Sequence, residues 1–160
     1  MKYFLAIMIL VVPLIVSSGC SSEDAAPVSQ TNQENLNETG EVMKDTIRIT
    51  IGERVFNATL EANDAATAFK AMLPLTINMS ELNGNEKFFD LPSNIPGNAS
   101  NPRTINSGDL MLWGSKTLVL FYKTFTTSYS YTRLGKIEDP SGLQNALGVG
   151  NVMVIFESQN

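Results

Sequence analysis

The feature of this 160-residue chain that most constrains its fold is a series of short segments with alternating apolar residues. Ile47, Ile49 and Ile51 alternate with polar residues, which is typical of a strand with one buried face. Gly52-Glu53 makes a turn into a second segment of this kind at 54–60. Further strands are predicted at 75–79, 87–91, 109–113, 117–122, 131–137 and 151–157.

Two short helices are expected between these strands. The first is capped by Asn63 or Asp64 and ends at Pro74. Its apolar residues recur at helical spacing, namely Ala65, Ala68, Phe69 and Met72. The second runs from Pro140, a residue favoured at the first helical position, to Leu147, and Gly148 ends it.

Together these elements predict one mainly β domain. The longest irregular stretch, 92–104, carries three prolines and must be a loop. Short strands that are joined by turns leave free sheet edges unless the sheet closes on itself. We therefore predict a closed eight-stranded barrel with one α-helix and a short second helix.

The N-terminal segment predicts export. Lys2 precedes an almost wholly apolar run at 3–16, which fits the core of a signal peptide (about 7–15 residues) and is short for a membrane span (about 20). The small residues 17–19 precede Cys20, the only cysteine. This ending resembles a prokaryotic lipobox, in which the cysteine is lipidated and becomes the mature N-terminus, although Ser17 stands where that motif prefers Leu. An ordinary secretory signal with a stray cysteine, or a short anchor helix, is the alternative.

The segment between Cys20 and the first strand is polar. Residues 21–45 hold six acidic side chains and few large apolar ones, so we expect a disordered tether. The predicted organisation is a signal peptide at 1–19, a lipidated cysteine with its tether at 20–45, and a globular domain at 46–160. The expected location is the outer side of the cytoplasmic membrane, or the periplasm or outer membrane.

Composition excludes several classes of function. The chain has no histidine, which removes Ser-His-Asp catalysis and histidine metal sites. With its one cysteine lipidated, it has no disulfide and no thiol nucleophile or ligand. A formal charge of −5, without any Lys/Arg cluster, gives no electrostatic footprint for nucleic acid. We therefore expect neither a metal nor another cofactor, and no nucleic-acid partner.

Aromatic and hydroxyl side chains crowd residues 121–131. Pockets for small ligands combine apolar walls with a few hydrogen-bonding groups, so this stretch is a candidate binding rim. Its candidate ligand-binding residues, with Trp113 from a nearby strand end, are Trp113, Tyr122, Phe125, Tyr129 and Tyr131. The alternative is that these residues only pack, because strands favour aromatic residues and lone tryptophans often anchor cores.

Arg133 is the charged candidate at this rim. In an extended chain it would share one face with Tyr129 and Tyr131. Arg103, in the Pro-rich loop, is the alternative. Either guanidinium could clamp a carboxylate of a ligand by forking onto its two oxygens. The competing interpretation of both is a surface ion pair.

Residues 46–157 as a whole resemble the cyclophilin-like fold, in particular its small prokaryotic branch. The order of elements matches, with a hairpin, a helix, several strands, a second helix and a last strand. The segments that carry the resemblance are 47–51, 63–69, 73–74, 83–90, 107–113, 120–122 and 134–137.

The resemblance also bears on activity. Peptidyl-prolyl isomerases of the cyclophilin family use an arginine on a strand after the first helix, beside an apolar proline pocket. The corresponding strand, placed at 86–91, has no arginine, and the family's pocket histidine falls near Tyr131. We therefore expect a non-catalytic module that binds a peptide or small ligand at the rim 121–133. The alternatives are an isomerase acting on exported proteins and a scaffold that contacts only protein partners; the oligomeric state stays open.

Overall fold

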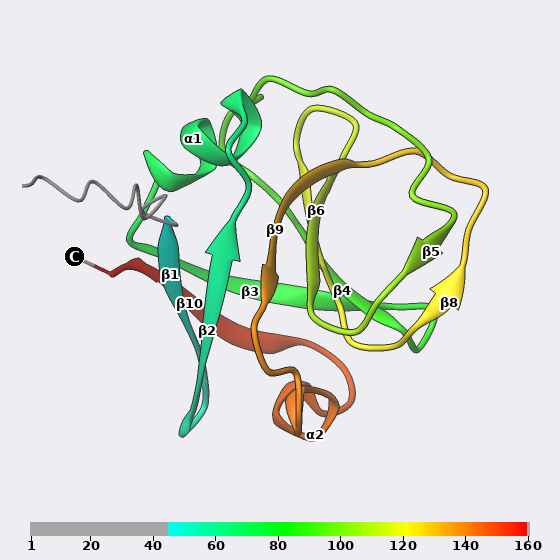
Figure 1. Ribbon diagram of the computed structural model, residues 1–160. Coiled ribbons are helices and arrows are strands. Elements are labelled where there is room, and N and C mark those ends of the chain that lie inside the picture. The colour runs from blue at the N-terminus through cyan, green and yellow to red at the C-terminus, as the bar shows by residue number, and fades with distance from the viewer. Residues whose placement is uncertain (1–44, 160) are drawn as a thin grey trace, which may run out of the picture. The chain divides into compact units, whose positions relative to one another are not determined.

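The computed structural model describes residues 45–159, and eight antiparallel strands of this part close into a barrel (Figure 1). The order around the barrel is β1 (Thr46–Ile51), β10 (Val152–Ser158), β3 (Leu75–Leu82), β4 (Glu86–Asp90), β7 (Thr117–Phe121), β6 (Asp109–Trp113), β9 (Thr132–Ile137) and β2 (Arg54–Leu60). Strand β2 pairs again with β1 and closes the ring. The predicted closed eight-stranded barrel is confirmed.

The alternation in the sequence sets which side chains enter the barrel. Ile47, Ile49 and Ile51 are all buried, while Arg48 between them is exposed. In β1 these isoleucines pair with alternate residues of β2 and β10, so the apolar faces of neighbouring strands meet inside. The expected alternation of β2 and β10 is confirmed in the same way, with Phe56 and Phe156 buried.

Two helices close opposite ends of the barrel (Figure 1). Helix α1 (Asp64–Lys70) follows β2, and α2 (Leu143–Leu147) follows β9, the antiparallel neighbour of β2. Phe69 of α1 is fully buried and meets the ring of Phe156 edge-on at 5.8 Å. Leu143 and Leu147 of α2 belong to the same main core. The helices are therefore plugs for the barrel interior.

The predicted ends of both helices need correction. Helix α1 begins as expected, with the Asn63 side chain capping Ala66 N at 2.8 Å, but it ends at Lys70 rather than at Pro74. Helix α2 does not start at Pro140, because the chain first makes a turn in which Leu143 N donates to Pro140 O at 3.0 Å. Gly142, at φ 80°, then takes the N-cap position. This left-handed conformation favours glycine and separates the turn from the helix.

A smaller pair of strands lies outside the barrel. The two-residue strands β5 (Thr104–Ile105) and β8 (Phe125–Thr126) pair with each other and are called here the β5–β8 ribbon. It packs on a second apolar cluster on the outer face of β4, β6 and β7. The buried members of this cluster are Ile105, Met111, Val119, Phe121 and Tyr131, with Phe88 and Phe125 partly buried against them.

Neighbouring residues on these strands divide between the two cores. Phe89 packs against the main core and Phe88 against the second cluster, as expected for consecutive residues of a strand. Among residues 45–159 no helix has the length and apolar character needed to cross a membrane. The predicted signal peptide, Cys20 and the tether lie outside the described residues, apart from Asp45.

Candidate functional site

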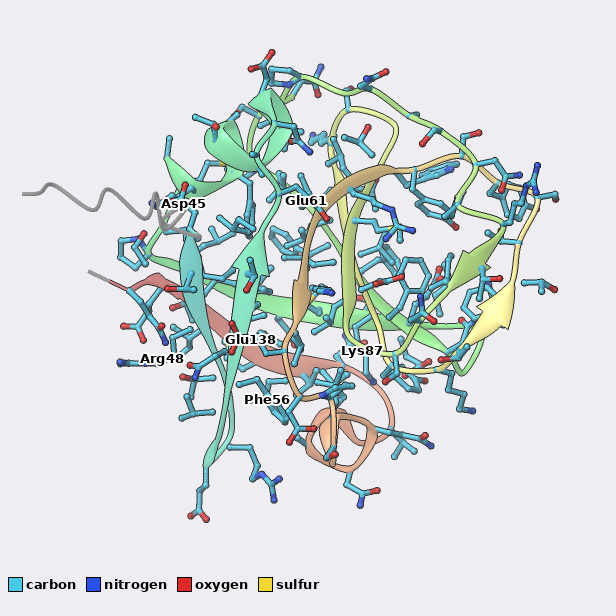
Figure 2. All side chains as sticks on the ribbon, in the orientation of Figure 1. Asp45, Arg48, Phe56, Glu61, Lys87 and Glu138 are labelled. Carbon is cyan, nitrogen blue, oxygen red and sulfur yellow. The ribbon has the colours of Figure 1, made fainter. Side chains whose placement is uncertain are left out.

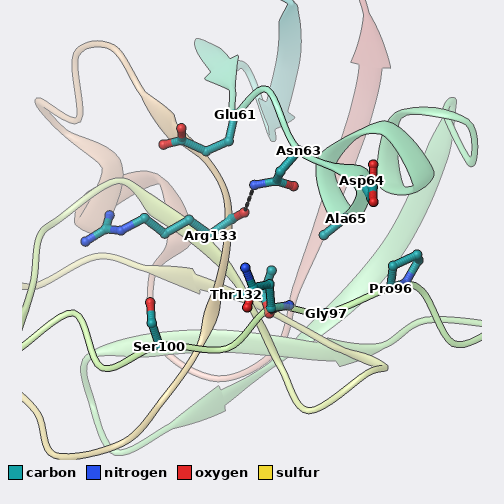
Figure 3. Close-up of a pocket in the computed structure, with 10 residues that line it drawn as sticks. Glu61, Asn63, Asp64, Ala65, Pro96, Gly97, Ser100, Thr132 and Arg133 are labelled. Carbon is teal, nitrogen blue, oxygen red and sulfur yellow. Dashed lines mark hydrogen bonds between the residues drawn. The ribbon is translucent and has the colours of Figure 1, made fainter.

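A pocket of about 390 Å³ opens beside the start of α1 (Figure 3). Three segments line it: the approach to α1, the loop at 96–100 and the first residues of β9. Its lining residues are Glu61, Asn63, Asp64, Ala65, Pro96, Gly97, Asn98, Ser100, Thr132 and Arg133. Ala65 and Pro96 are its apolar side chains, so the pocket is suited to a polar ligand.

Hydrogen bonds fix the three walls to one another. The Asn63 side chain donates to Arg133 O at 2.9 Å while its oxygen caps α1, which ties the helix start to β9 (Figure 3). Asn98 N donates to the Thr132 hydroxyl at 2.9 Å. Ser100 and Tyr131 exchange two backbone hydrogen bonds of 3.0 Å. The pocket therefore has preformed walls although two of them are loops.

Gly97 allows the loop to pass this close to β9. A Cβ atom at this position would lie 3.3 Å from the Thr132 hydroxyl and 3.4 Å from Gly114 O. Both distances are at the tight end of ordinary contacts, so a side chain here would push the loop outward. The small residue thus sets the depth of the pocket.

Arg133 is the cation of this pocket. Its side chain is 43% exposed, and its nearest acidic partner is the buried Asp109, at 3.8 Å between Nη1 and Oδ2. That distance is too long for a hydrogen bond. The Asp109 oxygen already accepts from Asn106 N at 2.8 Å, as expected for an aspartate that caps its own turn. The guanidinium is therefore held by the charge of Asp109, while its donors make no hydrogen bond to a described residue.

Two carboxylates share the pocket with this arginine. Glu61 and Asp64 are exposed and line the wall formed by the approach to α1. Figure 3 shows the Glu61 side chain extending in the same direction as that of Arg133. The pocket thus offers open donors on one wall and acceptors on another.

Of the seven predicted ligand-binding residues, only Arg133 lines this pocket. Tyr122 is 7% exposed and belongs to the main core, and its hydroxyl donates to Glu81 at 2.7 Å. Tyr131 is 8% exposed, with its ring edge-on to Phe121 at 5.5 Å. Phe125 lies half-buried on the same Phe121 ring. These three aromatic residues pack rather than form an open rim.

The other candidates are exposed but scattered. Trp113 and Tyr129 are 56% and 67% exposed, and neither lines the pocket. Arg103 lies in the loop with φ 62°, where its N–H donates to the Asn101 side chain. Tyr131 and Arg133 share the outer face of the barrel, since Arg133 pairs with Met111 of the second cluster. Tyr131 is buried there, however, whereas Arg133 is exposed, and Tyr129 precedes β9.

A buried lysine forms a second polar constellation (Figure 2). Lys87 is fully buried, and its ammonium donates to Glu81, Gly148 O and Gly150 O at 2.5, 3.0 and 2.5 Å. Burial acts to raise the pKa of Glu81. The hydrogen bonds from Lys87 and Tyr122 and the charge of Lys87 outweigh the effect of burial, so the pKa of Glu81 is lowered. Burial, the hydrogen bond to Glu81 and the negative charges nearby raise the pKa of Tyr122 to about 12. This network fastens the α2–β10 loop to the barrel.

Glu86 lies next to this network on the opposite face of β4. It is 8% exposed and pairs with Phe121 of β7. Burial, and then the charge of Glu81, raise the pKa of Glu86 to about 7. Burial and the charges of Glu86 and Tyr129 likewise raise the pKa of Tyr131. Within residues 45–159, no cluster of three or more acidic, histidine or cysteine side chains could hold a metal ion.

Neither the pocket nor the buried network was predicted from the sequence, for different reasons. The pocket walls at 61–65 and 96–100 come from a helix start and a loop, which carry no periodic signal. For Lys87 the signal was ambiguous: residues two apart on a strand share a face, so either Lys87 and Phe89 or Glu86 and Phe88 could face the core. A strand with Phe89 turned inward must also turn Lys87 inward.

Comparison with known proteins gives one family. The model of the Cyclophilin-like family matches residues 49–157, more than half of the chain. The solution structure of the hypothetical protein AF2241 from Archaeoglobus fulgidus is also similar, with 17% sequence identity over 72% of this chain and 95% of that chain, and a TM-score of 0.48. No curated protein matches the chain.

Proposed function

The chain belongs to the cyclophilin-like family, and on this premise we propose that its domain is a non-catalytic module that binds a peptide or small ligand through a carboxylate. The observation that carries this proposal is the half-exposed Arg133 guanidinium on the wall of the 390 Å³ pocket. A planar guanidinium presents five N–H donors and matches the two oxygens of a carboxylate. No hydrogen bond from the Arg133 guanidinium is made to another described residue, so a ligand meets free donors.

The remaining lining suits the rest of such a ligand. Glu61 and Asp64 are acceptors for an N–H, an ammonium or a hydroxyl group. Ser100 adds a hydroxyl that both donates and accepts. A peptide end carries a carboxylate together with N–H groups, and this combination fits a pocket with donors and acceptors on separate walls.

The same lining disfavours prolyl isomerisation. Stabilising a twisted prolyl amide needs a preorganised cation beside an apolar slot for the proline ring. Arg133 has Ala65 and Pro96 as the apolar side chains of its pocket. Neither β3 nor β4, the two strands that follow α1, carries an arginine. A binding role therefore fits these residues better than an isomerase does.

Binding of a plain peptide acid tests this function. Tri-alanine titrated into the purified full chain by calorimetry should bind, whereas its C-terminal amide should not. Arg133→Gln should weaken binding of the acid roughly tenfold or more, because a charge-assisted pair is lost. Arg48→Gln, which changes an exposed arginine of β1 away from the pocket, is the matched control and should bind as the unchanged chain does.

The outcome that refutes this function is equally specific. If acid and amide bind alike, or if Arg133→Gln and Arg48→Gln behave alike, Arg133 does not hold a carboxylate. Absence of binding for both peptides favours a scaffold that meets only protein partners.

We further propose that the domain is exported and held at a membrane by a lipid on Cys20. The support is the residue pattern before it, with Lys2, the apolar run and the small residues 17–19. Stable anchoring requires more than one acyl chain on the cysteine. Cys20→Ser should release the protein from washed membrane fractions, as followed by blotting. Retention of Cys20→Ser in the membrane would instead indicate an uncleaved anchor helix.

A further inference from the structure

Glu86 is a buried residue on the face of β4 that carries the second apolar cluster. It pairs with Phe121 across β4 and β7, and directly paired residues of antiparallel strands project from the same face. Phe121 belongs to the second apolar cluster, which the β5–β8 ribbon covers. Glu86 is 8% exposed, and its carboxyl makes no hydrogen bond or ion pair within residues 45–159. A buried, unpaired carboxylate is costly, whereas the neutral acid is tolerated.

The groups around Glu86 do not compensate its charge. Glu81 of β3 is an acid, and Lys87 is committed on the opposite face of β4 to Glu81 and two carbonyl groups. Tyr122 and Tyr131 have pKa values raised above their usual range, so both stay neutral where Glu86 titrates. The cations next to the ribbon, Arg103 and Lys123, are exposed and form no ion pair with Glu86. Near neutral pH, Glu86 is therefore the group that changes charge in this cluster.

The ribbon over this cluster is held mainly by packing. Its strands pair at two positions, Thr104↔Thr126 and Ile105↔Phe125. Ile105 is fully buried in the cluster, and the Phe125 ring lies 5.7 Å from that of Phe121. Small elements with few hydrogen bonds open locally at low cost. An unpaired charge on Glu86, beside the cluster that the ribbon covers, would favour opening of the ribbon, because the open form hydrates the carboxylate more fully.

We propose that Glu86 is a proton-operated latch: the neutral acid keeps the β5–β8 ribbon closed over the second cluster, and ionisation of Glu86 releases the ribbon. Tyr131 connects the ribbon to the pocket wall. Its side chain packs in the cluster that the ribbon covers, and its backbone exchanges two hydrogen bonds with Ser100 of the pocket. Any effect of the latch on ligand affinity rests on the proposed function, whereas the motion of the ribbon does not.

The direction of the effect follows from linkage. The pKa of Glu86 is about 7 in the folded protein, above its ordinary value of 4.5. Between these values the closed form holds more protons than an open form in which Glu86 meets water. The free energy by which Glu86 favours the closed ribbon is therefore largest below pH 4.5. It falls as the pH rises and stops changing above about pH 7.

Hydrogen exchange of the full chain tests the latch without any ligand. Protection factors of amides at 104–106 and 125–127, corrected for intrinsic exchange, should fall roughly tenfold or more between about pH 5.5 and about pH 8. Glu86→Gln, which is neutral at every pH, should keep the ribbon protected throughout. Glu53→Gln, which neutralises an exposed glutamate in the β1–β2 turn, is the control and should keep the normal pH dependence.

Two results would overturn the proposal. One is a ribbon whose protection does not change with pH in the unchanged chain, and the other is a Glu86→Gln protein that still loses protection. Should Glu86→Gln fail to fold, the carboxyl ¹³C shift of Glu86 in the unchanged chain decides. A titration midpoint near pH 7 that coincides with shifts in the ribbon supports the latch, and a midpoint near the ordinary value of 4.5 refutes it.

Discussion

Lys87 and Arg133 show at the scale of single residues how burial decides what a cation can do. The ammonium of Lys87 is fully buried and satisfied by one carboxylate and two backbone carbonyls. All three of its donors are used, so it holds the structure together and has none to offer a ligand. Arg133 is 43% exposed and forms no hydrogen bond with a residue in 45–159, so its donors are available to a ligand.

Replacing Lys87 by methionine should therefore destabilise the fold. The change leaves Gly148 O and Gly150 O without a donor and removes the positive partner of Glu81. Unsatisfied buried groups and a broken ion pair of this kind should lower the free energy of unfolding by about 2–4 kcal/mol in urea denaturation.

Lys70→Met is the matched control for that measurement. Lys70 forms an ion pair with Asp45 at 2.7 Å, in which both side chains are at least one-third exposed. Its loss should cost less than about 1 kcal/mol. Equal stability losses for Lys87→Met and Lys70→Met would contradict the structural role given to Lys87.

The sequence predicted the cation of the pocket but not its surroundings. Arg133 was identified from its chemistry and from its spacing to Tyr129 and Tyr131. The tyrosines were assigned to the same rim because an extended chain was assumed through residues 129–133. Tyr131 and Arg133 do share a face, but Tyr131 is buried in the cluster that the β5–β8 ribbon covers, and Tyr129 lies outside β9. Such tertiary packing leaves no local pattern to read.

At the scale of elements, the contact between β9 and β2 depends on a glycine. A Cβ atom at Gly135 would lie 2.5 Å from Thr59 O and 3.1 Å from the Cα atom of Leu60. The first distance is shorter than real Cβ contacts, and the obstructing atoms belong to the backbone. Gly135 therefore lets the two strands approach where the barrel closes between β9 and β2.

Gly135→Ala should consequently weaken the barrel at this seam. We expect a loss of about 1–3 kcal/mol in the free energy of unfolding, since one of the two strands must move. Lys136→Ala, at the exposed neighbour on β9, should change stability by no more than about 0.5 kcal/mol. A Gly135→Ala protein as stable as the unchanged chain would show that β9 and β2 pack less closely at Gly135 than described.

The elements that the sequence predicted well are those with a clear period. Alternation, or short apolar runs between turn residues, located all eight barrel strands, and a cap at Asn63 or Asp64 marked the start of α1. The strands β5 and β8 were missed because two residues cannot show a period. The predicted start of α2 was wrong because Pro140 suits the first position of a helix as well as the turn that precedes α2.

At the scale of the whole molecule, closure of the barrel separates an inner core from an outer cluster. The inner core is sealed by the two helices, while the outer cluster is covered by the β5–β8 ribbon. The polar pocket lies beside α1, apart from the aromatic residues of the outer cluster. The pocket thus gives Arg133 only Ala65 and Pro96 as apolar side chains, and none from the outer cluster.

This separation predicts little prolyl isomerase activity. Cis-to-trans exchange of a proline-containing peptide should stay close to the uncatalysed rate, which has a time constant of about tens of seconds or longer. The measurement is exchange spectroscopy of the peptide with and without the protein. A clear acceleration that disappears in Arg133→Gln or in Arg103→Gln would make the domain an isomerase instead.

The position of a bound carboxylate ligand decides whether the polar pocket is the binding site. Tri-alanine should be added to the ¹⁵N-labelled protein, and the shifted backbone and guanidinium signals mapped. We expect shifts at Arg133, Gly97, Asn98 and Ser100, and their loss when the peptide is amidated. Shifts confined to the aromatic residues 121–131, with Arg133 unchanged, would contradict this expectation.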